Sequence, residues 1–289
     1  VPQEEVVYQP SAELAGKNVV ALSMEAQLLM DRVNGKGLFG AIGGGLGILK
    51  GAFLRALRYS GATMVFSLLV YEVGVDQEMA DKTPRFINDA SLDYSLLFNG
   101  YEDEIELWEK AGEKTITFSL AGRELTASVV NMRLKVKGAA NDSFVLFIHI
   151  PDGIEKRLYP GGEKSIGRFI QAAYYGRASL EALEAFSIRP DIFQVHEAFP
   201  AVSLLVDLFE NDRYKNKDIF KEAKKHIIGF AHTVVPASFP FYDPYLISLI
   251  LGIDQARYTK YLTIRPDAGE NPVFDPFYAL SSKAVVVGT

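Results

Sequence analysis

Three short segments carry residues whose types and spacing suit the binding of an anion or a sugar. Gly43–Gly44–Gly45–Leu46–Gly47 stands directly before an amphipathic pattern. The start of a helix leaves backbone N–H groups without intrahelical partners, and glycine lets an anion approach them closely. His196–Glu197 and His232–Thr233 each follow an apolar run of the length of a buried strand. Because open α/β sheets bind ligands at the carboxyl ends of their strands, we expect both pairs to face one cleft.

Each of these features also has a purely structural interpretation, which the sequence leaves open. The glycines would equally suit a tight crossing between a strand and a helix, where only small residues fit. A lone histidine is more often a structural residue than a ligand. The spacing of His196, Glu197 and His232 is not that of a metal site, so we expect no metal. The glycines lack the context of a dinucleotide fingerprint, and no GxSxG element indicates a hydrolase.

The composition is that of an ordinary globular protein. The 289 residues are 48% apolar and 23% charged, which gives ample material for a core. The absence of cysteine excludes disulfides and a cysteine nucleophile, and it is typical of a cytoplasmic protein. A net charge of -6 with scattered Lys and Arg disfavours nucleic acid as a partner. Since no apolar run is long enough to span a bilayer, we expect no membrane association.

The elements that must position these residues follow from hydrophobic periodicity. Continuous apolar runs predict buried parallel strands, and amphipathic patterns between them predict crossover helices. We therefore expect an α/β fold of the Rossmann-like type, with a parallel sheet between two layers of helices. The predicted strands are 18–24, 62–71, 144–150, 190–195, 227–231 and 282–288, and the predicted helices are 25–33, 48–60, 166–186, 199–210, 218–226 and 245–251.

Two stretches do not follow this alternation. Residues 1–17 are expected to form an arm, because Pro2 and Pro10 discourage regular structure. Residues 81–142 are expected to form a β-rich antiparallel insertion. Its strands are predicted at 115–120, 124–130 and 132–136, with breaks at 121–123 and at Asn131. No linker interrupts the chain, so residues 1–289 are expected to form a single domain.

Six segments, taken in order along the chain, carry a family resemblance. The segments are SMEA (23–26), GGGLGILKGAFLRAL (43–57), VYEVGVDQ (70–77), RLYPGGEKSIGRFIQAAYY (157–175), RPDIFQVHEAFPA (189–201) and AHTVVPA (231–237). In their order and spacing they resemble the N-terminal half of glycogen and α-glucan (maltodextrin) phosphorylases. The resemblance implies the GT-B glycosyltransferase fold, in which two Rossmann-like domains hold a sugar site between them.

The resemblance implies roles for particular residues. Glu25 and His232 match active-site residues, of which His232 would contact the bound glucose. The amides of Gly44 and Gly45 would lie near phosphate groups. The implied reaction transfers a glucosyl residue between the end of an α-1,4-glucan and phosphate, with pyridoxal phosphate as cofactor. The remaining substrate-binding positions would be Leu46, Gly47, His196, Glu197 and Thr233.

The same resemblance implies that part of the active site lies outside this sequence. The cofactor lysine and the basic residues for substrate phosphate belong to the C-terminal domain of the family, which is absent from these 289 residues. A second chain or domain, or a homo-oligomer, is therefore expected. Ala21, Phe199 and Ala237 depart from the family pattern. Two alternatives stay open: a catalytically lapsed protein that binds glucan or assembles with others, and a glucan synthase-type enzyme that uses a nucleotide sugar.

Overall fold

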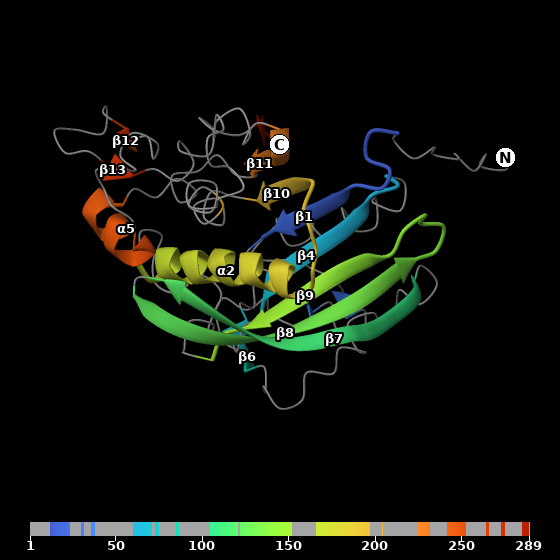
Figure 1. Ribbon diagram of the computed structural model, residues 1–289, viewed down its shortest axis with the longest axis horizontal. Coiled ribbons are helices and arrows are strands. Elements are labelled where there is room, and N and C mark those ends of the chain that lie inside the picture. The colour runs from blue at the N-terminus through green and yellow to red at the C-terminus, as the bar shows by residue number, and fades with distance from the viewer. Residues whose placement is uncertain are drawn as a thin grey trace.

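The computed structural model describes the chain in separate stretches, and an eight-stranded sheet forms their centre (Figure 1). The described residues are 12–23, 60–70, 105–120, 122–151, 166–196, 225–231, 242–252 and 285–288, together with Leu204 and the two-residue strands β2 (Met30–Asp31), β3 (Lys36–Gly37), β5 (Val73–Gly74), β6 (Arg85–Phe86), β12 (Ile264–Arg265) and β13 (Val273–Phe274).

Six neighbouring strands of the sheet run parallel, in the order β14-β11-β10-β1-β4-β9. The side chains of β1, β4 and β9 are mostly apolar and buried on both faces, as expected for strands covered on both sides. All six strands correspond to predicted apolar runs, so the α/β, Rossmann-like fold class is confirmed. The strands are β1 (Asn18–Leu22), β4 (Thr63–Leu69), β9 (Ser143–His149), β10 (Ile192–His196), β11 (Ile227–Ala231) and β14 (Val285–Gly288).

A long antiparallel hairpin completes the sheet at the β9 edge. It consists of β7 (Ile105–Leu120) and β8 (Arg123–Val136), and β8 pairs with β9. The β-rich, antiparallel character predicted for this part of the chain is confirmed, whereas the three short strands predicted within it are two long strands that extend the central sheet. Asn131 does not break β8. It lies opposite Gly112, next to a register shift in β7, and is paired with Leu146 on its other side.

Another prediction was wrong near the N-terminus. Met30–Asp31, inside the predicted helix 25–33, forms strand β2 and pairs with Lys36–Gly37. The sequence between the two strands contains Asn34–Gly35, a pair that is common in hairpin connections and disfavours a continuous helix. Residues 12–17 of the predicted arm form a turn whose Gly16 N–H donates to the Gly61 carbonyl, at 3.0 Å. This part of the predicted arm is therefore ordered against the beginning of β4, and residues 1–11 lie outside the described residues.

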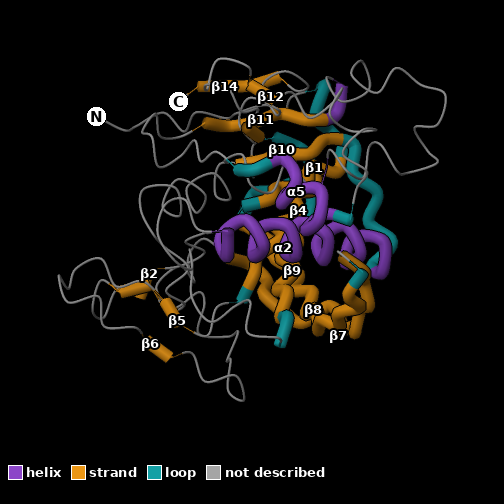
Figure 2. The backbone as a smooth tube through the Cα atoms, turned by 90° about the vertical axis from the view of Figure 1, so that its left-hand side faces the viewer, coloured by secondary structure: helices purple, strands orange, loops and turns teal. Residues whose placement is uncertain are grey.

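Helix α2 (Ile166–Ala185) covers one face of the sheet and contacts β7 and β9 (Figures 1 and 2). Its buried side chains, among them Phe169 and Tyr175, join an apolar core with β1, β4, β9 and the distal half of the hairpin. A second core, around Met64 and Phe66, occupies the opposite face. Of the helix predicted at 48–60 only Ser60 is described, and it lies in a turn. Of the helices predicted at 199–210 and 218–226 only Leu204 and Lys225–His226 are described, all helical.

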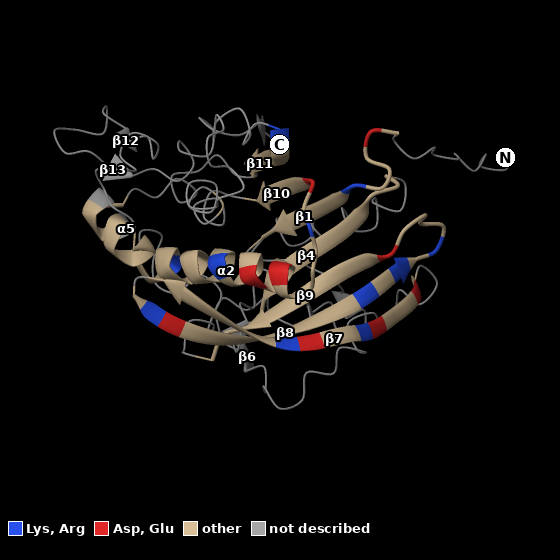
Figure 3. Ribbon diagram, viewed as in Figure 1, with Lys and Arg blue, Asp and Glu red and all other residues tan. Residues whose placement is uncertain are grey.

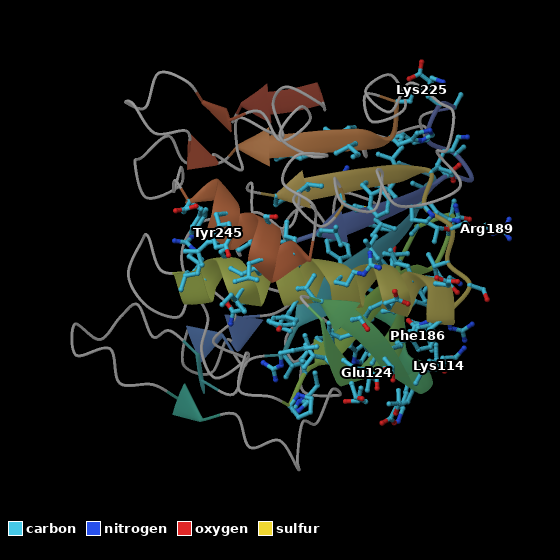
Figure 4. All side chains as sticks on the ribbon, turned by 60° about the vertical axis from the view of Figure 1, so that its left-hand side comes forward. Lys114, Glu124, Phe186, Arg189, Lys225 and Tyr245 are labelled. Atoms are coloured by element: carbon cyan, nitrogen blue, oxygen red, sulfur yellow. The ribbon has the colours of Figure 1, made fainter. Side chains whose placement is uncertain are left out.

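The end of α2 is fixed on the hairpin. The Ile188 and Ser187 amides donate to the Leu183 and Glu184 carbonyls at 2.8 and 2.9 Å, which is a Schellman cap. Ser187 holds the left-handed position, with φ of 57°. The Lys114 ammonium group donates to the Ala185 carbonyl and lies over the Phe186 ring (Figure 4).

Helix α5 (Pro244–Leu251) lies beside the beginning of α2 (Figure 2). The Asp243 carboxylate caps it by accepting from the Tyr245 amide at 2.7 Å, and Gly252 ends it in the left-handed conformation. The Tyr242 ring, just before α5, packs on Phe169 with centroids 4.9 Å apart. The helix predicted at 245–251 is confirmed.

Candidate functional site

The strands that carry the predicted site end at one edge of the sheet. Strand β10 lies between β1 and β11 and is parallel to both. Leu22 is level with Val195, and His196 is level with Phe230, so the ends of the three strands form one row. This brings together the points from which the chain continues toward the predicted residues. Most of the predicted site residues lie outside the described residues. They are Glu25, Gly44, Gly45, Leu46, Gly47, Glu197, His232 and Thr233.

His196 is the one predicted site residue that the structure describes. Its side chain is 3% exposed and stacks face to face on Phe230 of β11, with centroids 4.7 Å apart and planes 8° apart. This environment supports the structural interpretation of His196, because a ring packed within the sheet does not project toward solvent. Its contact with substrate stays a prediction.

Beneath the end of β1 lies a buried hydroxyl that no sequence motif indicated. The Tyr175 hydroxyl accepts a hydrogen bond from the Ser23 amide at 3.1 Å and donates to the Ser67 carbonyl at 2.5 Å. Tyr175 and Ser67 are 0% exposed and Ser23 is 1% exposed. One side chain of α2 thus ties the end of β1 to the middle of β4.

Two serines extend this contact into a network. The Ser67 hydroxyl donates to the Ser179 hydroxyl at 2.8 Å, and the Ser179 hydroxyl donates to the Tyr175 carbonyl, one turn earlier in α2, at 2.7 Å. Burial raises the pKa of Tyr175 to about 12, an effect opposed in part by its hydrogen bonds. The sequence held a weak signal, since Ser67 interrupts an otherwise apolar buried strand, but the partner on a distant helix could not be identified from it.

The opposite edge of the sheet carries charged and polar contacts. The Asp191 carboxylate accepts from the Asn18 amide at 2.9 Å, and the Asp191 carbonyl lies 2.9 Å from His226 Nδ1. Arg189 and Lys225 are seen at this side in Figure 4, away from Tyr245. His226 therefore lies at the amino edge of the sheet, opposite the ends of β1, β10 and β11.

The charged side chains of the hairpin form cross-strand pairs rather than a single-sign patch (Figure 3). Arg133 pairs with Glu109, and Lys135 pairs with Glu106 at 2.8 Å. These pairs are half exposed, so each contributes little to stability. Their alternation of sign gives no surface of the kind that binds phosphates.

Neither a metal site nor a cofactor lysine is present in the part of the chain that the structure describes. No three His, Asp or Glu residues there are grouped to hold a metal ion. A Schiff base with pyridoxal phosphate requires a lysine in a protected pocket. The described lysine side chains are exposed or half buried, and four of them are engaged with surface partners: Lys17, Lys110, Lys114 and Lys135. The described residues therefore do not fit that cofactor. No described helix is long and apolar enough to cross a membrane.

Comparisons with known proteins place the fold in a class. No family model matches the chain, and neither does any curated protein sequence. Among solved structures, the chain is similar to the catalytic domain of starch synthase IV from Arabidopsis thaliana bound to ADP and acarbose. The TM-score is 0.59 at 17% sequence identity, over 94% of this chain and 44% of that one.

That catalytic domain is a GT-B glycosyltransferase, and the chain shares the GT-B type of Rossmann-like α/β fold. The chain spans less than half of the length of the neighbour. An identity of 17% establishes the fold and not the reaction.

Proposed function

We propose that this chain contributes one half of a GT-B glucosyltransferase that acts at the end of an α-glucan. The observation that carries the proposal is the row formed by the ends of β1, β10 and β11 at one edge of a GT-B-type sheet. The chain continues from these ends into Glu25, Glu197 and His232, which the resemblance to phosphorylases assigns to the sugar site. Ligands of open α/β sheets bind at this edge.

The residues of this half would bind and orient the sugar rather than attack it. The Gly44 and Gly45 amides would donate hydrogen bonds to an anionic group, and His232 would hold a glucose hydroxyl. Glucosyl transfer develops positive charge on the sugar ring, which a neighbouring anion stabilises, so a protein nucleophile is not required. Pyridoxal phosphate would be held by a second domain or chain.

Two glucosyl donors fit the proposal, a glucosyl phosphate and a nucleotide sugar, and each has its own support. The six collinear segments favour a phosphorylase, which exchanges glucosyl between glucan and phosphate. The structural neighbour is a starch synthase that was bound to ADP and acarbose, which favours transfer from a nucleotide sugar. The two proposals share the glucan and differ in the group that leaves or enters at the anomeric carbon.

The proposed partner is a second domain or chain, and the surface of α5 supports it. Tyr245, Leu246 and Leu249 are 67%, 41% and 61% exposed on this short, uncharged helix. Figure 1 shows α5 at the end of the molecule toward which the arrows of β1 and β10 point. An apolar surface beside the strand ends suits the packing of another domain across the site.

Glucan binding by residues 1–289 tests the proposal directly. Titration with a maltooligosaccharide in a calorimeter is expected to show binding that His232→Ala weakens by about tenfold or more, the value of a hydrogen bond to a sugar. His226→Ala is the matched control, because His226 lies at the opposite edge of the sheet. Absence of binding to the unmodified chain would contradict a glucan substrate.

Turnover distinguishes the two donors. We expect residues 1–289 alone to release no glucose 1-phosphate from maltodextrin and phosphate, because half of the electrostatic stabilisation would be absent. When the chain is completed by its second half, release of glucose 1-phosphate would identify a phosphorylase. Release of ADP from ADP-glucose would identify a synthase and exclude the phosphorylase proposal.

A further inference from the structure

We propose that Tyr175 is a positioning residue, whose hydroxyl fixes the carboxyl end of β1 and thereby the segment that leads to Glu25. The link to Glu25 rests on the proposed function, whereas the tie to β1 rests on geometry alone. Tyr175 belongs to α2, 152 residues from Ser23 in sequence, so the contact joins two elements that the fold alone brings together.

The hydroxyl is oriented by its own donor bond. It donates to the Ser67 carbonyl at 2.5 Å, which leaves its lone pairs to accept from the Ser23 amide at 3.1 Å. Its ring is 0% exposed, so the packed core on α2 allows little rotation. The Ser23 amide therefore meets an acceptor of fixed position rather than water.

The distance along the chain is short enough for this tie to matter at the site. Ser23 follows the last residue of β1, and Glu25 is two residues further on. Two residues span at most about 7 Å of backbone, so the position of Ser23 limits the region that the backbone of residue 25 can reach. Catalytic groups require placement to within roughly 0.5 Å, which favours a rigid tie at this point.

A buried polar contact of this kind is costly unless it is complete. An apolar residue at position 175 would satisfy the packing of α2 but would leave the Ser23 amide and the Ser67 carbonyl without this partner. Packing alone thus explains an aromatic ring at this position, and it does not explain the hydroxyl. The placement of the β1 end does.

The experiment compares Tyr175→Phe with Ser179→Ala by hydrogen–deuterium exchange and by titration with a maltooligosaccharide. Ser179→Ala removes hydrogen bonds from the same network but leaves the Tyr175 hydroxyl on the Ser23 amide. We expect exchange in a peptide covering residues 19–25 to rise about tenfold in Tyr175→Phe and to stay unchanged in Ser179→Ala. The maltooligosaccharide affinity is expected to fall in parallel, in Tyr175→Phe only.

Each outcome decides a different statement. Unchanged exchange in residues 19–25 of Tyr175→Phe would overturn the positioning role. Faster exchange with unchanged affinity would overturn the link to Glu25. If the unmodified chain binds no glucan, the proposed function fails, and the exchange result still decides the tie to β1. Should Tyr175→Phe not fold, an unprotected Ser23 amide in the NMR spectrum of the unmodified protein would refute the proposal.

Discussion

The ionisation of Tyr175 provides a quantitative test of the buried network. Its pKa is raised from 10.0 to about 12 because burial disfavours the phenolate. The unfolded chain therefore loses this proton near pH 10, and the folded chain retains it until near pH 12. The stabilising contribution is complete below pH 10 and is lost as the pH rises toward 12.

The magnitude follows from the size of the shift. A difference of about two pKa units corresponds to roughly 2.7 kcal/mol once the pH exceeds both values, and to about 1.3 kcal/mol between about pH 9 and about pH 11. Tyr175→Phe removes this dependence. It also leaves a buried amide and a carbonyl without this partner, which costs about 1–3 kcal/mol at neutral pH.

The assay is urea unfolding of both proteins at about pH 9 and about pH 11, followed by circular dichroism. We expect the unmodified protein to be more stable at about pH 9 by about 1–3 kcal/mol and its advantage to shrink by about 1.3 kcal/mol at about pH 11. Tyr242, whose pKa is also raised by burial, titrates in both proteins and cancels in the difference. An advantage that does not change with pH would refute the buried position of the hydroxyl.

Three further substitutions test other parts of the structure. Ser187→Gly is expected to raise the free energy of unfolding by about 0.5–1 kcal/mol, since glycine relieves the left-handed backbone; Ser187→Ala is the control, and an equal gain there would contradict this reason. Leu249→Lys is expected to change stability by less than about 0.5 kcal/mol while weakening association with the second half in ultracentrifugation; unchanged association would argue against α5 as the contact surface. A double-mutant cycle of His196→Ala and Phe230→Leu is expected to give a coupling of about 0.5–1.5 kcal/mol in thermal unfolding, and a value near zero would show that the ring stack contributes nothing.

The parallel strands could be predicted from sequence because their signal is local. Residues 63–69 and 143–149 are apolar on both faces, and a run of that length with few polar positions is typical of a strand buried on both sides. The hairpin was harder to predict. Its two strands are sixteen and fourteen residues long. Asn131 was predicted to be a break because the local sequence does not show its pairing with β7 on one side and β9 on the other.

The candidate site could be predicted only as far as the strand ends. Apolar runs indicated where β10 and β11 stop, and their adjacency then followed from the topology. The burial of His196 could not be predicted, since it depends on Phe230, thirty-four positions away in the sequence. The Tyr175 contact was likewise invisible, because no local pattern links a helix position to a strand end 152 residues earlier.

The two buried contacts at the strand ends differ in position from the residues that are proposed to contact the sugar. The His196 ring and the Tyr175 hydroxyl both lie within the sheet or against it, and neither projects from the edge. In the proposed function, a sugar at this edge contacts residues that follow the strands, such as Glu25 and His232, while the buried groups join neighbouring elements beneath the strand ends. The proposal then assigns different effects to these positions: a conservative change at position 175 alters the placement of the sugar, and changes at positions 25 and 232 alter its direct contacts. The hydroxyl of Tyr175 then serves the placement of the β1 end as well as the stability of the fold.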